Sequence, residues 1–454
     1  MKRYIQFFVM VGVCCACGES FLDMKRNTRQ VIPEKISDYQ ALLDRNSTLN
    51  GSPCVELALL SSDEYNVSDQ VLSSVPEYYR NTYLWQPEIF AGTESNDWNN
   101  AYQRIMYANL ALDVGKLRPT AAEQDAWNNV KGSALFFRSF AFFQLAQLFC
   151  KPYDPTTASM DMGIPLRTDY DVSVKYGRST VKEVYDRIVA DLTEAINLLP
   201  DTSINKFRPS KLVACFVLAN VYMHMGNYPE AYRYSDRALA IKNDLIDYNT
   251  LDASAAYTFP YEHDGGSILE VLMYLRLNTT LIAESRVNVD SNLLELYHPS
   301  DLRKGLYFRQ LPDGRTIFKG AYSGPGIYFT GLATDELWLI RAESQIRTGR
   351  IEEGMTDIYH LLEHRYRDDD YLQLKPENEE EALRIVIEER RKELFMRGTR
   401  WGDLRRWNSD SRFRTGLERR IDGTVYELPP GDPRWTFPIP DNEIDLGDLK
   451  QNVR

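Results

Sequence analysis

Two helical segments joined by a short turn constrain the fold of this chain more than any other feature. Lys211 to Met225 and Pro229 to Ile241 are separated by only a few residues, one of which is Gly226. Small side chains let two antiparallel helices approach closely, and a glycine suits the tight turn between them. The positions that carry the pattern are Leu218, Ala219, Tyr222, Gly226, Tyr228, Ala231, Ala238 and Leu239. The pattern predicts a scaffold built from stacked helix pairs.

The spacing of this pair is that of a tetratricopeptide repeat, and the segment from Asp335 to Leu361 echoes it. The matching positions of the second copy are Ala342, Gly349, Ile351 and Gly354. A long stretch separates the two copies, so they do not form one continuous array. A generic helical hairpin is the alternative interpretation, above all for the second copy.

Apolar residues three and four positions apart predict further helices on both sides of this pair. The strongly apolar segment 134–148 carries two such stripes, which is typical of a helix buried on most sides. Thr180 and Glu183 form a capping box before another helix, and Gly398 is a plausible helix stop. The expected helices cover residues 97–117, 134–148, 181–199, 335–347, 351–366 and 377–397.

The stretch from about 250 to 330 differs, because it is rich in Gly, Thr and Tyr and lacks long helical periodicity. Pro312-Asp313-Gly314 and Asp422-Gly423 each lie between β-prone runs, which predicts two β-hairpins. Because we find no low-complexity linker, we expect one compact domain over residues 17–454. The expected fold is therefore mainly α-helical, with irregular excursions and short hairpins near 45–95 and 250–330.

The N-terminus has the pattern of a lipoprotein signal peptide. Lys2 and Arg3 precede an apolar stretch that is too short to span a bilayer. Ala16 and then Cys17 follow, so we expect residues 1–16 to be removed and Cys17 to be lipidated. Cys14 stands where the lipoprotein pattern has Leu, and Cys15 is a weaker alternative for the modified residue. An ordinary secreted protein is the other alternative.

Charge and cysteine content exclude some classes of protein. The net charge of −12 argues against nucleic-acid binding, which needs a basic surface. Beyond the signal only Cys54, Cys150 and Cys215 remain, and three cysteines cannot all pair internally. Arginines interleaved with Glu389, Glu393 and Asp403 predict ion pairs that hold the last helices together.

Several blocks of sequence, in order along nearly the whole chain, match one known family. The N-terminal blocks are Cys17 with Phe21-Leu22-Asp23, Trp98 to Asn109, Lys131 to Phe149 with Gly163-Ile164-Pro165-Leu166, and Arg178 to Pro200. The C-terminal blocks are Glu389 to Leu394, Gly398 to Trp407, Phe437-Pro438-Ile439-Pro440, Glu443-Ile444 and Gln451-Asn452. In these blocks the chain resembles the SusD/RagB family of outer-membrane nutrient-binding lipoproteins. Arg397 stands where that family often has Glu, and Gly402 where it often has an aromatic.

The resemblance implies a scaffold of four tetratricopeptide-like helix pairs whose excursions build the ligand face. It also implies a protein that is lipid-anchored in the outer membrane and exposed at the cell surface. Its function would be to bind a glycan or other oligomeric nutrient and pass it to a SusC-like TonB-dependent β-barrel transporter. The rival hypotheses are a scaffold that grips a peptide or the barrel itself, and a surface hydrolase.

We expect no cofactor, no metal and no catalysis. His360-Leu361-Leu362-Glu363-His364 matches the H-x-x-E-H pattern of some zinc proteases, with both histidines on one helix face. We expect these histidines to be solvated instead, because no third ligand can be picked out. Nothing in the sequence marks a pair of glycosidase carboxylates or a nucleophile.

Sugar rings bind by stacking on aromatic side chains, so aromatics in irregular segments are the candidate ligand contacts. The candidates are Tyr78, Tyr79, Trp85, Tyr274 and Tyr322. For each of them a role in the core is the alternative, because aromatic side chains are mostly buried.

Overall fold

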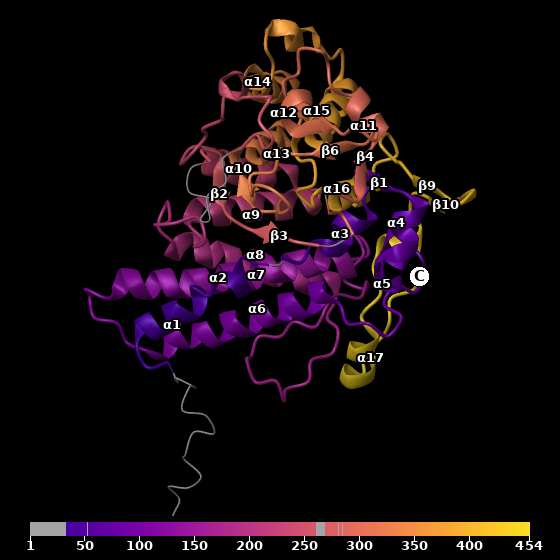
Figure 1. The fold of residues 1–454 in the computed structure, drawn as a ribbon. Helices are drawn as coiled ribbons and strands as arrows, with labels where there is room; N and C mark the ends of the chain where they lie inside the picture. Colours follow the sequence, from indigo (N-terminus) through magenta and orange to yellow (C-terminus); the bar gives the residue numbers. More distant parts are fainter. Residues whose placement is uncertain (1–32, 52, 260–267, 280, 284) are drawn as a thin grey trace, which may run out of the picture.

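The computed structural model describes residues 33–51, 53–259, 268–279, 281–283 and 285–454 (Figure 1). The expected signal peptide and Cys17 lie outside this range. In the described part of the chain, none of the helices is long and apolar enough to cross a membrane. Cys54, Cys150 and Cys215 are all buried and none of them forms a disulfide.

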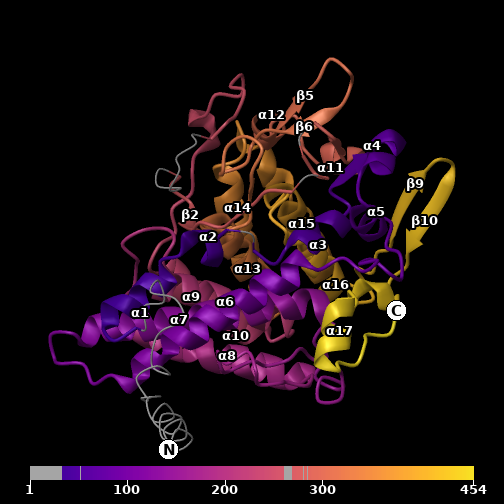
Figure 2. The same ribbon diagram turned by 60° about the horizontal axis from the view of Figure 1, so that its bottom comes forward.

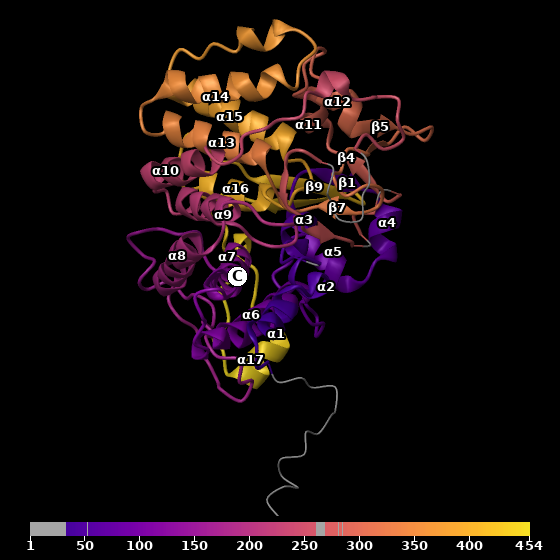
Figure 3. The same cartoon turned by 90° about the vertical axis from the view of Figure 1, so that its left-hand side faces the viewer.

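Eight helices form the scaffold, and each packs against the next in chain order. They are α6 (Asn96–Leu112), α7 (Gln124–Phe149), α8 (Val181–Leu198), α9 (Lys211–His224), α10 (Tyr228–Leu239), α13 (Thr334–Ile346), α14 (Ile351–Glu363) and α15 (Glu379–Glu393). Figure 3 shows the stack rising from α6 to α14 and α15. The predicted helical fold is confirmed, and the two predicted helix pairs, α9 with α10 and α13 with α14, pack together.

Glycine residues explain both predicted helix pairs, α9 with α10 and α13 with α14. Between α9 and α10 the backbone of Gly226 has φ +71°, a conformation that favours glycine. Asn227 then caps α10 by accepting a hydrogen bond from the Glu230 amide. In α14, a Cβ on Gly354 would lie 2.8 Å from the carbonyl oxygen of Ala342 in α13, so only glycine allows this close approach.

Most other helix boundaries follow the predictions. Thr180 and Glu183 form the expected capping box at the start of α8. The helix expected over residues 134–148 is α7, which begins ten residues earlier, at Gln124, and is buried along most of its length. The prediction for the end of α15 was wrong, because the helix ends at Glu393, five residues before Gly398. Gly398 has φ +81° and a Cβ there would lie 3.1 Å from the side chain of Val55, so this glycine allows a close approach between segments.

The N-terminal part of the described chain holds short elements beside the scaffold. These are α1 (Ile36–Leu43), α2 (Asn46–Leu49), α3 (Glu56–Ser61), β1 (Tyr65–Val67), α4 (Asp69–Ser74) and α5 (Glu77–Tyr83). We call residues 45–95 the first excursion and residues 250–330 the second excursion.

The second excursion and the residues after it contain short strands and two short helices. The strands are β2 (Val271–Met273), β3 (Arg276–Leu277), β4 (Val287–Val289), β5 (Phe308–Gln310), β6 (Thr316–Phe318), β7 (Tyr328–Phe329) and β8 (Leu332–Ala333). The helices are α11 (Ser291–Glu295) and α12 (Arg303–Tyr307). β5 and β6 form the hairpin predicted at Pro312-Asp313-Gly314.

The two excursions are joined to each other. β1 of the first pairs antiparallel with β4 of the second, so that Tyr65 lies opposite Val289 and Val67 opposite Val287 (Figure 1). The four valine and tyrosine side chains of these pairs are buried. Segments more than 200 residues apart, as Asn50 and Tyr274 are, therefore fold as one unit.

The C-terminal part of the chain packs back against the scaffold. It contains α16 (Arg400–Trp407), β9 (Leu417–Ile421), β10 (Thr424–Leu428) and α17 (Asp441–Gly447). β9 and β10 form the second predicted hairpin, which extends from the body of the protein in Figure 2. The Phe437 amide donates to the Leu148 carbonyl, which ties the C-terminal segment to α7.

A buried network of arginines and carboxylates fastens the second excursion to the scaffold. Arg365, just after α14, donates to Glu270 at 2.8 Å and to Glu393 at 2.8 Å. Arg303 of α12 donates to the other oxygen of Glu393 at 2.9 Å. All four side chains have an exposed fraction of 0%. The ion pairs predicted for Glu389, Glu393 and Asp403 are confirmed.

Glu393 is the residue that both arginines share. Burial raises its pKa, but the guanidinium groups of Arg365 and Arg303 outweigh burial, so the pKa of Glu393 lies below its usual value. The ionised carboxylate is therefore the stable form, and it balances charges that would be costly to bury alone.

We predict that Glu393→Gln lowers the free energy of unfolding by about 3 kcal/mol, because it leaves two buried guanidinium groups short of one negative charge. Urea unfolding measures this change. The folded-state pKa of Glu393 is depressed, so its contribution is present above the unfolded-state pKa and is lost as the pH falls. The deficit of the variant should therefore shrink below about pH 4.

Glu380→Gln is the matched control in the same helix. Glu380 pairs with Arg384 at the surface, where both side chains are about half exposed. Such pairs contribute about 0–1 kcal/mol. Equal losses of stability in the two variants would contradict the role given to the buried network.

Candidate functional site

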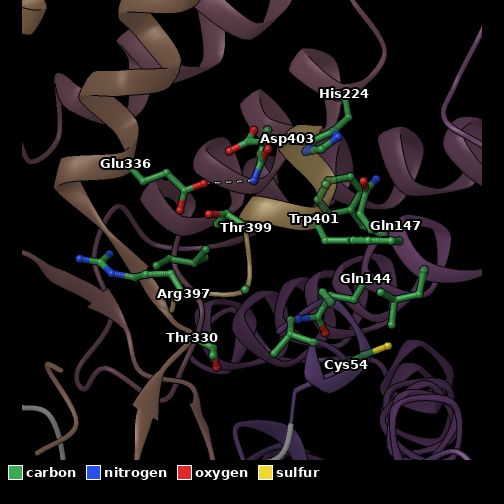
Figure 4. Close-up of a pocket in the computed structure, with 18 of the residues that line it drawn as sticks. Cys54, Gln144, Gln147, His224, Thr330, Glu336, Arg397, Thr399, Trp401 and Asp403 are labelled. Carbon is green, nitrogen blue, oxygen red and sulfur yellow. Dashed lines mark hydrogen bonds between the residues drawn. The ribbon is translucent and has the colours of Figure 1, made fainter. Parts of the chain in front are cut away.

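A small polar pocket lies where both excursions meet the scaffold. We call it the central pocket, and its volume is about 90 Å³. Figure 4 shows side chains from α7, α9, α13 and α16 around it. Its labelled lining residues are Cys54, Gln144, Gln147, His224, Thr330, Glu336, Arg397, Thr399, Trp401 and Asp403.

Four buried polar atoms of the lining have no hydrogen-bond partner in the described protein: Asn220 Oδ1, Thr330 Oγ1, Arg390 Nη1 and Trp401 Nε1. Buried polar groups are usually paired with protein or with ordered water. The volume of the central pocket corresponds to about three water molecules. Ligand sites usually measure about 300–1,000 Å³, so the central pocket suits water better than a sugar.

Burial and neighbouring charges shift the titration of the pocket groups. Burial raises the pKa of Glu336 to about 7 although Arg390 opposes the shift, and Asp403 adds to it. Burial, helped by Arg406, lowers the pKa of His224 to about 3. Burial also raises the pKa of the Cys54 thiol well above its usual value. At neutral pH, Cys54 is therefore a thiol and a poor nucleophile.

The central pocket explains why Arg397 and Gly402 depart from the family pattern. A Cβ on Gly402 would lie 3.0 Å from His224 Cε1, so an aromatic side chain does not fit at this position. Arg397 donates to buried Asp335 at 3.1 Å, and its guanidinium lies 4.6 Å from the centre of the Tyr322 ring. The cation at position 397 thus balances a buried carboxylate.

A larger open groove lies at the end of α7. We call it the C-terminal groove, and its volume is about 770 Å³, within the range of ligand sites. Its lining residues are Lys151, Pro152, Met160, Asp161, Met162, Arg405, Asn408, Ser409, Gly431, Asp432, Pro433, Trp435, Thr436, Lys450, Asn452 and Val453. Met160 is 74% exposed and Val453 79% exposed, so the groove presents apolar surface to a ligand.

The C-terminal groove has more positive than negative side chains. Arg405 is buried and donates to the carbonyl oxygens of Gln147 and Cys150, at the end of α7. No described carboxylate lies within ion-pair distance of Arg405, and burial lowers its pKa to about 10. Lys151 is paired with Asp161 at 2.7 Å, whereas exposed Lys450 has no ion pair among the described residues.

A second open groove of about 700 Å³ lies beside α1. Its lining includes polar side chains such as Gln40, Arg118, Asn129 and Arg208, but no aromatic residue. Its apolar residues Ile36 and Leu117 are half-buried, so it presents less apolar surface to a ligand than the C-terminal groove does.

The structure places four of the five candidate stacking residues in the core. The exposed fractions are 6% for Tyr78, 2% for Trp85, 1% for Tyr274 and 4% for Tyr322. A ring that is covered by protein offers no face to a ligand, so the prediction of stacking platforms is wrong for these four. Tyr79 is half-buried, and for this residue a ligand contact stays a prediction.

The buried rings hold the excursions together. Trp85 Nε1 donates to the Ser61 carbonyl at 3.0 Å. The Tyr322 hydroxyl donates to Glu270 at 2.8 Å, which places this tyrosine in the ionic network. None of the five candidates lines the C-terminal groove. Its residues come from three distant segments, and no local sequence pattern marks them.

Two clusters of possible metal ligands occur in the described chain. The carboxylates of Glu270, Asp335 and Glu393 are buried, and they already accept hydrogen bonds from Arg365 and Arg397. The other cluster is His360, Glu363 and His364, at the surface end of α14. The predicted juxtaposition of the two histidines on one helix face is therefore present.

The chain matches two family models and a known protein. The family model described as "Starch-binding associating with outer membrane" matches residues 20–223, and the model described as "SusD family" matches residues 334–454. The unmatched residues between them contain the second excursion. The SusD-like protein P2 of Formosa agariphila is 27% identical over 245 residues, which cover 51% of this chain. The match spans only 45% of that relative's own length.

Solved structures share the fold across nearly the whole chain. A SusD superfamily protein from Bacteroides thetaiotaomicron has a TM-score of 0.74 at 21% identity, covering 93% of this chain and 100% of its own. A structure described as a putative sugar binding protein from Bacteroides vulgatus has a TM-score of 0.76 at 20% identity, covering 93% and 99%. At such identities the likeness concerns the fold alone.

We predict that Glu336→Gln stabilises the protein more at about pH 8 than at about pH 5. The folded-state pKa of Glu336 is raised, so wild type loses stability as the pH rises from the unfolded-state pKa to about 7. The amide does not titrate, so the variant should gain up to about 3 kcal/mol relative to wild type over this interval. Urea unfolding at both pH values measures the gain.

Glu353→Gln, an exposed position in α14, is the control and should change stability by less than about 0.5 kcal/mol at either pH. A difference between Glu336→Gln and wild type that does not vary with pH would contradict the raised pKa.

Proposed function

The chain belongs to the SusD family, and from that premise we propose that it binds a glycan at the cell surface and passes it to a SusC-like TonB-dependent β-barrel transporter. The observation that carries the proposal is the match of residues 20–223 to the family described as "Starch-binding associating with outer membrane", which supports both the ligand class and the location. The fold shared with a protein described as a putative sugar binding protein agrees with it.

We place the glycan in the C-terminal groove. Sugar sites combine apolar surface with a few polar groups that orient the hydroxyls. Met160 and Val453 supply exposed apolar surface, and Asn408 and Ser409 supply hydrogen-bonding groups. Asn408 Nδ2 has no acceptor in the described protein.

The charge of the groove favours an acidic glycan. Its lining holds three cationic side chains, Lys151, Arg405 and Lys450, against two carboxylates, Asp161 and Asp432. This local excess of positive charge occurs in a chain whose net charge is −12. Carboxylate or sulfate groups on a sugar would gain charge-assisted hydrogen bonds from exposed Lys450.

We propose binding without bond cleavage. A glycosidase needs one carboxyl group that stays protonated and can donate its proton to the leaving group. Asp432 in the groove is instead paired with Arg434 at 2.8 Å, and the hydrogen bond from Arg434 holds the pKa of Asp432 below its usual value. Asp161 is paired with Lys151. Neither carboxylate is arranged to act as a general acid.

Lipidation of Cys17 is part of the same proposal. Acyl chains on Cys17 would hold the protein at the membrane, beside its transporter. Such tethering raises the effective concentration of the binder at the channel and makes transfer of the ligand efficient without a tight permanent complex.

We predict that the double substitution Met160→Ala/Lys450→Ala weakens binding of an acidic oligosaccharide at least about tenfold, because it removes an apolar contact and a cation from the groove. Both side chains are exposed, so the fold should not change. Calorimetric titration with neutral, uronate-containing and sulfated oligosaccharides measures the affinities.

Val172→Ala/Lys175→Ala is the matched control, since it removes the same kinds of exposed side chain from a surface outside the groove. Loss of affinity in the control as well would contradict the placement of the site. If wild type binds no oligosaccharide of the panel, or releases shortened products from one, the glycan-capture proposal itself fails.

A further inference from the structure

The end of α14 brings together three side chains that suit a transition-metal ion. His360 and Glu363 lie in the last turn of α14, and His364 follows as its C-cap. Each offers one ligand atom, and the three atoms all lie within 4.8 Å of one another. Residues three and four positions apart share one helix face, so the helix itself sets this arrangement.

The orientation of His364 leaves one ring nitrogen available to a metal. His364 Nδ1 lies 2.9 Å from the carbonyl oxygen of His360. Because a carbonyl oxygen only accepts, Nδ1 must carry the hydrogen, and the lone pair is on Nε2. Metal-binding histidines usually donate their other ring N–H to such an acceptor, which fixes the tautomer.

His360 is held in place by its neighbours. Its ring centre lies 4.4 Å from that of Trp338 in α13 and 5.1 Å from that of His364. Its Nδ1 lies 3.9 Å from a carboxylate oxygen of Glu363.

The surrounding charges favour a cation. The nearby positive groups are already paired: Arg341 of α13 donates to Asp357 at 2.7 Å and to Asp236 at 2.8 Å. Two carboxylates thus more than balance the single charge of Arg341. Arg365, which follows His364, is paired with Glu270 and Glu393. Glu363 adds a further negative charge with an exposed side chain.

We propose that His360, Glu363 and His364 bind one divalent transition-metal ion, with Zn²⁺ as the expected ion. Two imidazoles and one carboxylate are typical zinc ligands at about 2.0–2.2 Å, and nitrogen donors disfavour Ca²⁺ and Mg²⁺. The side chains must rotate to bring all three ligand atoms, which lie within 4.8 Å of one another, to these distances from one ion. Water or a group from a bound molecule completes the coordination.

This site is a binding site rather than a protease centre. In the H-x-x-E-H proteases the motif supplies metal ligands and a catalytic glutamate. Here Glu363 itself serves as the third ligand, so it is not available as a general base. The site lies on α14, near the top of the stack in Figures 1 and 3, whereas the C-terminal groove lies at the end of α7.

Calorimetric titration of the untagged full chain with Zn²⁺ tests the proposal, and Co²⁺ serves as a visible-absorption probe of the ligand set. We expect one ion per chain. His360→Ala and His364→Ala should each lower the affinity at least about tenfold and abolish the tetrahedral Co²⁺ spectrum. Glu363→Gln, an exposed position, should weaken binding without any risk to the fold.

His298→Ala is the matched control, because His298 is a half-exposed histidine outside the cluster, beside Asp370. It should bind Zn²⁺ as wild type does. Absence of Zn²⁺ binding by wild type overturns the proposal, and so does binding that survives Glu363→Gln together with His364→Ala. Equal loss in His298→Ala would also overturn it. Glycan titration of the same variants should be unchanged, so this site can fail independently of the proposed glycan function.

Discussion

The ion pairs of Glu393 are the interaction on which the rest of the structure depends. Its two carboxylate oxygens accept from Arg303 in α12 and from Arg365 after α14, and Arg365 also binds Glu270. This network joins the second excursion to the last helices of the scaffold. Pairing of β1 with β4 then attaches the first excursion to the second. A stack of helices thereby carries two irregular segments in one fixed position.

The sequence predicts the scaffold well, because its helices depend on local rules. Apolar periodicity predicts all eight scaffold helices. Gly226 predicts the turn between α9 and α10, and Thr180 predicts the start of α8. The ion pairs of Asp403 could also be predicted, since its partners Arg390 and Arg406 alternate with carboxylates in the same stretch of sequence. The arginine partners of Glu393, which are Arg303 and Arg365, come from distant segments and could not be predicted. The end of α15 could not be predicted either, because Gly398 serves a contact with Val55 instead of a helix cap.

The prediction of exposed stacking residues fails for a physical reason. Irregular segments with polar neighbours are expected to be exposed, but in this protein two of them pack on each other and bury four of the five candidate rings. Tyr322 joins the ionic network and Trp85 bonds to α3. The C-terminal groove is assembled from the end of α7, from α16 and from the C-terminal residues. Only tertiary structure brings these segments together, so no single stretch of sequence reveals the groove.

The proposed function assigns one role, capture of a nutrient for a neighbouring transporter, to the open groove and to the lipid anchor that we propose at Cys17. The most direct measurement is to label cells that produce the protein with palmitate and to isolate it, after cross-linking, from their outer membranes. The account predicts a labelled chain that copurifies with a TonB-dependent β-barrel. An unlabelled chain that is found free in the periplasm, without a barrel, would contradict it.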